Sequence, residues 1–135
     1  MKQRTILIDA NALADFFVGE EELREHSIRL RRKFPNWTTL PLCRYEFGNV
    51  LRTYTRLGKI RADDGLAMLK QGLSMVTFCA ECGDEVVLAE ANASNLTFYD
   101  AAYVARARAL GVKLHTRDRD ILKHCPEVAC PISEI

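Results

Sequence analysis

The sequence has no long hydrophobic run, because none of its apolar stretches approaches the roughly 20 residues that a membrane-spanning helix needs. The N-terminus, MKQRTILIDAN, does not resemble a secretory signal peptide either, since an acidic residue interrupts its short apolar segment. Membrane and secreted proteins are therefore not the expected classes, and the expected compartment is the cytoplasm. The net charge of +1 neither demands nor excludes a nucleic-acid partner, which depends on local basic patches.

The seven glycines never occur in the spacing of a dinucleotide-binding GxGxxG motif or of a Walker phosphate-binding loop. A receiver-type α/β domain would need an acidic pair after its first strand and a phosphorylatable Asp after its third. Cys79-Ala-Glu-Cys82 follows the third expected strand and contains no Asp. Dinucleotide-binding, P-loop and phospho-acceptor proteins are thus disfavoured.

A second closely spaced CxxC pair is also missing. The chain has five cysteines, an odd number without a secretory signal, which argues against a disulfide framework. Cys79 and Cys82 form one CxxC pair, and Cys125 and Cys130 are separated by four residues. Because a zinc site of this type needs two close pairs, buried or incidental thiols are the favoured interpretation.

The composition is that of one soluble globular domain. A chain of 135 residues with 48% hydrophobic and 27% charged residues has the usual size and balance of a single domain. It contains no internal repeat, low-complexity segment or linker. We therefore expect residues 1–135 to form one domain.

Strands and helices are expected to alternate along the chain. Apolar spacing and turn residues predict strands at 5–9, 37–40, 76–79, 112–116 and 128–132. They predict helices at 11–18, 20–34, 42–57, 60–75, 83–94, 97–110 and 118–124, with Gly58 and Gly111 at helix ends. This alternation indicates an α/β fold with a mainly parallel central sheet.

Two acidic residues are expected at the carboxyl ends of strands. Asp9 ends the apolar run Ile6-Leu7-Ile8, and Asp118 lies in HTRD, just after the fourth expected strand. Ligands of open α/β sheets bind outside the carboxyl ends of strands, at the point where the strand order reverses. The first and fourth strands are commonly neighbours there, so these two acids are expected to meet.

Two further acids have unusual surroundings. Glu46 lies in the first turns of the helix that follows the second strand, and Asp100 interrupts an alanine-rich helix that looks buried on most sides. A buried acid is costly unless it is paired or binds a cation. If all four acids converge, their repulsion raises pKa values and favours an oxygen-liganded Mg²⁺ or Mn²⁺.

Each acid also has a simpler explanation, which the spacing alone leaves open. Asp118 suits a helix N-cap, and Asp100 suits the first helical turn after Thr97. Glu46 has two possible cationic partners at helical or near spacing, Arg44 and Arg52.

Four motifs together resemble a known family. They are the strand that ends in Asp9 with a polar residue at 11, Glu46 on the third helix, LTFYDAAYVARARALG with Asp100, and LHTRDRDIL with Asp118. They resemble the PIN-domain ribonucleases, and among these the VapC-type toxins of toxin–antitoxin modules. The resemblance covers residues 5–132. It implies a three-layer α/β/α sandwich and metal-dependent cleavage of single-stranded or loop RNA. In-line attack by a metal-bound water is the hypothesis for the mechanism, and it would leave a 5′ phosphate and a 3′ hydroxyl.

The resemblance also implies roles for individual residues. The catalytic and metal-binding acids would be Asp9, Glu46, Asp100 and Asp118, with Mg²⁺ or Mn²⁺ as cofactor. Three auxiliary positions follow: Thr116 as the small polar residue of the Thr-x-Asp motif, Asp120 as an additional acid, and Asn11. The family most often has Ser or Thr where this chain has Asn11, whose side-chain carbonyl is expected to order the loop or hold a water.

The implied partners are RNA, a small antitoxin protein and a second copy of the chain in a homodimer. Basic residues that could contact RNA phosphates are Arg44, Arg52, Arg56, Lys59, Arg61, Arg117 and Arg119. Arg117 and Arg119 flank Asp118, and Arg117 is the preferred candidate. The amphipathic helices within 20–34 and 42–75 offer apolar faces for an antitoxin helix or for the second copy. Two alternatives remain: an RNA-processing nuclease outside any toxin pair, and an inert interaction module, to which Asn11 points.

Overall fold

The computed structural model describes residues 5–133, and within this range the chain forms five strands and seven helices. The strands are β1 (Thr5–Ile8), β2 (Asn36–Thr39), β3 (Val76–Phe78), β4 (Leu114–Thr116) and β5 (Ala129–Pro131). The helices are α1 (Ala10–Val18), α2 (Glu21–Lys33), α3 (Leu42–Arg56), α4 (Ala62–Ser74), α5 (Asp84–Ser94), α6 (Phe98–Leu110) and α7 (Arg119–His124).

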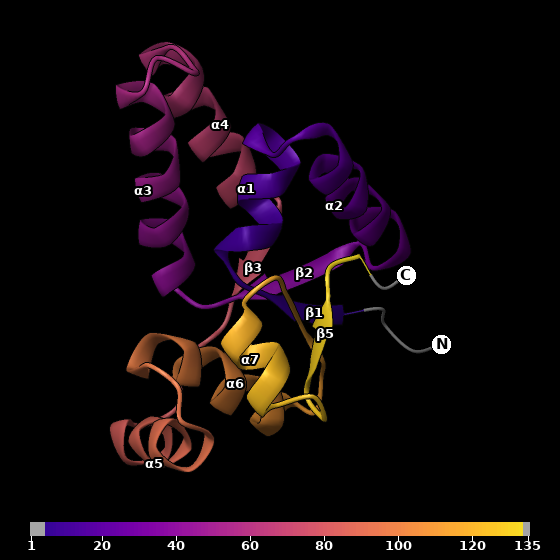
Figure 1. The fold of residues 1–135 in the computed structure, drawn as a ribbon, viewed down its shortest axis with the longest axis vertical. Helices are drawn as coiled ribbons and strands as arrows, with labels where there is room; N and C mark the ends of the chain where they lie inside the picture. The colour runs from indigo at the N-terminus through magenta and orange to yellow at the C-terminus, as the bar shows by residue number, and fades with distance from the viewer. Residues whose placement is uncertain (1–4, 134–135) are drawn as a thin grey trace.

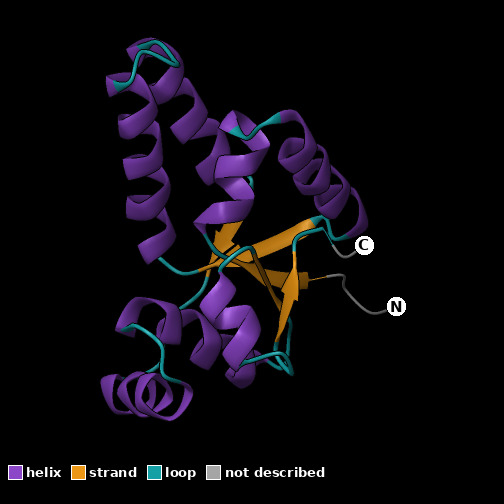
Figure 2. Cartoon of the chain, in the orientation of Figure 1, coloured by secondary structure: helices purple, strands orange, loops and turns teal. Residues whose placement is uncertain are grey.

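The five strands form one parallel sheet in the order β3-β2-β1-β4-β5. Helices α1 to α4 lie on one side of this sheet and α5 to α7 on the other, which makes three layers (Figures 1 and 2). The prediction of an α/β/α sandwich is therefore confirmed. The chain leaves β1 toward β2 and later returns to β4 on the opposite side, so the strand order reverses between β1 and β4.

The predicted elements are all present, and their ends differ from the predictions by one or two residues. The fourth strand begins at Leu114 rather than at Val112, because the Val112 N–H still donates to the Ala107 carbonyl and closes α6. Gly111 adopts a positive φ of 67° at this helix end, as glycine readily does. At the end of α3, Gly58 has a φ of 73° and α4 starts only at Ala62.

The core lies on both faces of the central strands. Ile6, Leu7 and Ile8 of β1 are buried, as expected for a central strand of a parallel sheet covered on both faces. On one side Trp37 and Phe47 are the largest buried side chains, and on the other side Tyr103 is. The buried alanines of α6 let this helix pack closely against the sheet: Ala101, Ala102, Ala105 and Ala107.

None of the helices in residues 5–133 is long and apolar enough to cross a membrane. The five cysteines are free thiols, with Cys43 and Cys125 buried and the others partly exposed.

Candidate active site

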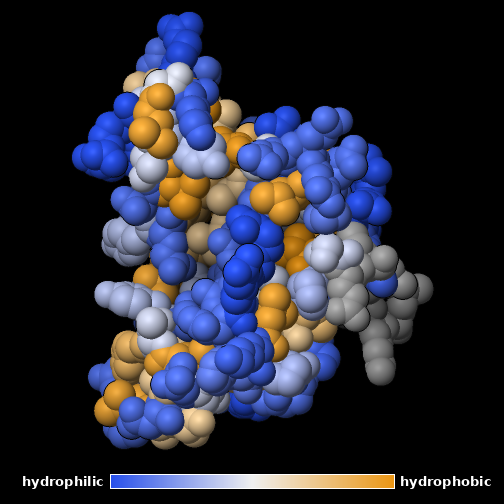
Figure 3. All heavy atoms as spheres, viewed as in Figure 1, coloured by the Kyte–Doolittle hydropathy of each residue, from blue (hydrophilic) through white to orange (hydrophobic). Residues whose placement is uncertain are grey.

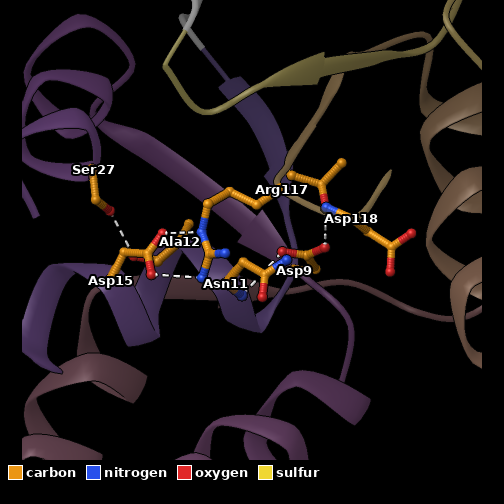
Figure 4. Close-up of polar contacts among 8 residues, drawn as sticks. Asp9, Asn11, Ala12, Asp15, Ser27, Arg117 and Asp118 are labelled. Carbon is orange, nitrogen blue, oxygen red and sulfur yellow. Dashed lines mark hydrogen bonds and ion pairs between the residues drawn. The ribbon is translucent and has the colours of Figure 1, made fainter. Parts of the chain in front are cut away.

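Asp9 lies at the point where the strand order reverses. It directly follows β1 and is the N-cap of α1, and only 7% of its surface is exposed. The backbone N–H of Asn11 donates to Asp9 Oδ1 over 3.0 Å (Figure 4). The hydroxyl of Thr116 donates to Asp9 Oδ2 over 2.6 Å. These two bonds hold the carboxylate rigidly between β1 and the end of β4.

Thr116 connects Asp9 to Asp118. The backbone N–H of Asp118 donates to Thr116 Oγ1 over 2.9 Å, so the Thr116 hydroxyl bonds both segments. Asp118 is also the N-cap of α7, since its Oδ1 accepts from the Ile121 N–H over 3.0 Å. The simpler explanation for Asp118 is thus correct, and a helix cap places this carboxylate beside Asp9.

Glu46 and Asp100 approach from α3 and α6. The phenol of Tyr103 is buried and donates to Glu46 Oε1 over 2.6 Å. None of the ion pairs among residues 5–133 joins Glu46 to Arg44 or Arg52, so that explanation of Glu46 is wrong. Asp100 lies one turn before Tyr103, in the first turn of α6, and its N–H donates to Thr97 Oγ1 over 3.1 Å. Tyr103 therefore connects the two helices that carry these acids.

The four acids influence one another electrostatically. Burial raises the pKa of Asp9 to about 7, against the opposing hydrogen bonds from Thr116 and Asn11, and the charges of Glu46 and Asp118 add to the rise. Burial also raises the pKa of Glu46, with a further contribution from the charge of Asp100.

Asp100 is linked to the remaining acids. Burial raises its pKa, and the negative charges of Asp118 and Asp120 raise it further. The acids thus form a connected network of like charges beyond the carboxyl ends of β1 and β4. The structure places Asp120 on the exposed side of this network, at the start of α7.

The donor set suits a hard divalent cation. Among residues 5–133 no three His, Cys, Asp or Glu side chains stand close enough to form a ready-made ligand cage. Mg²⁺ seldom uses such cages, because it usually keeps several waters and takes only one or two carboxylates. Oxygen donors that raise one another's pKa fit this mode, since a cation removes their repulsion. Asp9, Asp118, Glu46 and Asp100 are the residues that would hold the ion, directly or through its waters.

An ion pair that was not predicted lies next to these acids. Asp15, on the last turns of α1, has 2% of its surface exposed, and the guanidinium of Arg117 donates to both of its oxygens, over 2.6 and 2.8 Å. The sequence predicts that Arg117 contacts RNA. In the structure its Nε and one terminal nitrogen donate hydrogen bonds to Asp15 (Figure 4). The Asp15–Arg117 pair joins α1 to the loop after β4, and the Asp9–Thr116 bond joins the N-cap of α1 to the end of β4.

The other proposed residues lie on α1, α7 and α3 and in the turn that follows α3. Asn11 is half-buried in the first turn of α1, where its backbone N–H donates a hydrogen bond to Asp9 Oδ1. Arg119 is exposed on α7. The remaining basic candidates are exposed along α3 and the turn that follows it: Arg44, Arg52, Arg56, Lys59 and Arg61.

Residues 6–126 match the PIN domain family. Ribonuclease VapC3 of Pyrobaculum aerophilum is 33% identical over 132 residues, which is 93% of this chain and 98% of that protein. Exonuclease VapC9 of the same organism is 33% identical over 116 residues, 86% of this chain and 82% of that protein.

Solved structures agree with this match. The crystal structure of PAE2754 from Pyrobaculum aerophilum superposes with a TM-score of 0.77 at 30% identity, covering 95% of this chain and 89% of the other. A toxin–antitoxin complex from Klebsiella pneumoniae superposes with a TM-score of 0.70 at 21% identity, covering 96% of this chain and 99% of that one. The second likeness supports the fold alone.

Proposed function

Because the chain belongs to the PIN domain family, we propose that it is a metal-dependent endoribonuclease and the toxin of a toxin–antitoxin module. The network of four acids around Asp9, at the reversal of strand order, is the observation that carries this proposal. The name of the relative Ribonuclease VapC3 supports RNA as the substrate, since the match spans nearly both chains. The family and the full set of acids favour a nuclease over an inert interaction module.

The chain's own residues would prepare the site for hydrolysis of a phosphodiester. Asp9 is held by two hydrogen bonds at the end of a buried strand, so its carboxylate loses little freedom when it binds a ligand. Thr116 fixes the spacing between Asp9 and Asp118, because its hydroxyl bonds both. A bound Mg²⁺ or Mn²⁺ would supply charge stabilisation of the phosphate and help to activate the attacking water.

Glu46 and Asp100 would act on the substrate from helices α3 and α6. The buried phenol of Tyr103 holds one oxygen of Glu46 and leaves the second for the cation or for a water. Burial makes proton uptake at Glu46 and Asp100 easier than in water, since the pKa of each is raised. Hydrolysis of this kind is expected to leave a 5′ phosphate and a 3′ hydroxyl.

Exposed apolar side chains support a protein partner. Tyr45, Leu57 and Leu66 are 55% to 68% exposed on and beside α3 and α4, the helices that extend farthest from the sheet (Figure 1). Figure 3 shows hydrophobic patches over this pair of helices and over the region of α5. An antitoxin helix and a second copy of the chain are the proposed occupants of these surfaces.

Cleavage of a circular single-stranded RNA tests the proposed activity. The protein is expected to open the circle in Mg²⁺ or Mn²⁺ and to leave it intact in excess EDTA, because the acids then lack their cation. Sequencing of the new ends should show a 5′ phosphate and a 3′ hydroxyl. Asp63→Asn, which removes an exposed acid on α4, should cleave like the unaltered protein.

Activity that persists in EDTA would contradict metal dependence. Degradation of linear RNA that spares the circle would instead indicate an exonuclease.

A further inference from the structure

A pocket of about 320 Å³ adjoins the acid network, between α2, α7 and the end of β5. Its polar lining includes Thr116, which bonds Asp9, and three basic side chains, Arg117, Arg119 and His26. Its apolar lining includes Leu122 and Ile132. The volume lies at the small end of the range of about 300 to 1,000 Å³ for ligand pockets, which suits one nucleotide.

Asp15 orients one cation of this pocket. Both of its oxygens accept from Arg117, and the pair spans 102 residues of sequence. Because Nε and Nη2 make these two bonds, Nη1 and the outer N–H groups of Arg117 remain to donate to another acceptor. A guanidinium held in this way has little conformational freedom left to lose when it binds a phosphate.

Arg119 supplies the unpaired positive charge. It is exposed in the first turn of α7, and none of the ion pairs among residues 5–133 involves it. Arg117 and Arg119 flank Asp118 in sequence and line the same pocket, and Arg117 also feels the negative charge of Asp9. A lining that combines cations with apolar side chains matches a nucleotide, which has an anionic phosphate and a flat, largely apolar base.

Another hollow of similar size lies between α3 and α4, and within residues 5–133 it is not hydrogen-bonded to the acids. It is lined by residues such as Leu51, Leu66 and Leu69 together with Arg52 and Arg56. None of its lining residues hydrogen-bonds an acid of the network in the described chain. The pocket beside Thr116 is therefore better placed to hold the nucleotide next to a phosphate at the acids.

We propose that the pocket lined by Arg117, Arg119 and Leu122 binds the RNA nucleotide adjacent to the scissile phosphate, and that Asp15 is the positioning residue for Arg117. This proposal rests on the ribonuclease function proposed above. The phosphate of that nucleotide contacts the two arginines, and its base packs against Leu122 and Ile132.

Equilibrium binding of a short fluorescein-labelled single-stranded RNA in EDTA tests the pocket without requiring cleavage. Arg119→Gln is expected to weaken binding about tenfold and to reduce the salt dependence by about one phosphate contact. Arg117→Lys keeps the positive charge but loses the planar guanidinium that donates two parallel hydrogen bonds. It should therefore weaken binding with the salt dependence unchanged. Arg29→Gln, an exposed arginine of α2 outside the pocket, should bind within about twofold of the unaltered protein.

Steady-state cleavage gives the second readout. Arg119→Gln and Arg117→Lys should raise KM with kcat nearly unchanged, whereas a loss of general structure would lower the melting temperature and kcat together. Equal effects of Arg119→Gln and Arg29→Gln on RNA binding would overturn the pocket proposal. Unchanged RNA binding by Arg119→Gln, with lost binding of a polyglutamate peptide, would assign the pocket to a protein partner and would also overturn it. An unaltered protein that shows the expected binding pattern but never cleaves RNA would overturn only the ribonuclease proposal.

Discussion

Replacement of Asp9 by Asn is expected to abolish RNA cleavage, lowering kcat at least about 10³-fold, while the chain still folds. The amide has the shape of the carboxylate it replaces. Its oxygen can accept from the Asn11 N–H, and its nitrogen can donate to Thr116 Oγ1. The substitution therefore removes the charge that a divalent cation needs and preserves the contacts that hold the loop.

The same substitution is expected to stabilise the protein at pH 8 in EDTA. The pKa of Asp9 is about 7 in the folded chain, against an ordinary value of 3.8, so between these pH values the folded state keeps a proton that the unfolded state has lost. Stability accordingly falls as pH rises from about 4 to 7. The difference in pKa corresponds to a loss on the order of 4 kcal/mol in the free energy of unfolding, which the Asp9→Asn variant would avoid.

Urea unfolding at pH 5 and pH 8, with the cleavage assay, measures both effects. The unaltered protein should be less stable at pH 8 than at pH 5 in EDTA, and Asp9→Asn should reduce this difference. Asp63→Asn, at an exposed site, should change neither the pH profile nor kcat. Retention of most cleavage activity in Asp9→Asn would contradict the role assigned to this carboxylate.

Removal of Arg117 is expected to destabilise the fold strongly. Arg117→Ala leaves the carboxylate of Asp15 without its partner, although only 2% of the Asp15 surface is exposed. Removal of one member of a buried ion pair costs several kcal/mol, because the other charge stays desolvated. Since the Arg117 side chain is 41% exposed, we expect a loss of about 3 kcal/mol in the free energy of unfolding.

A double-mutant cycle separates this penalty from lost packing. In the Asp15→Asn background, Arg117→Ala should cost less than about 1 kcal/mol, because no buried charge remains to be paired. Arg119→Ala removes a neighbouring exposed arginine and should change stability by less than about 0.5 kcal/mol. An equal cost of Arg117→Ala in both backgrounds would show that the ion pair does not tie α1 to the loop before α7.

Sequence patterns predicted the fold because each element carries a local signal. The apolar run before Asp9 and the alternation of strands with helices indicated a central parallel strand, and β1 and β4 are indeed neighbours. The rule that sites form at the carboxyl ends of strands then brought Asp9 and Asp118 together. The caps at Asp9 and Asp118 confirm that both acids begin helices.

The contacts that orient the acids could not be predicted in the same way. Asp15 carried a signal, an acid on the apolar helix between Leu13 and Phe16, but its partner lies 102 residues away. Many lysines and arginines were possible partners, and only the packing of α1 against the loop after β4 selects Arg117. The Tyr103–Glu46 bond similarly depends on how α6 faces α3, which no periodicity within either helix encodes.

Location of Mn²⁺ by anomalous diffraction from crystals soaked in the ion is the most direct test of the acid network. The predicted result is one or two strong peaks bonded to the Asp9 carboxylate, at roughly the 2.0 to 2.2 Å typical of oxygen ligands of such ions, and facing Asp118. The same soak of Asp9→Asn crystals should lose them. Peaks confined to exposed acids such as Asp63 and Asp64, with none at Asp9, would contradict the account.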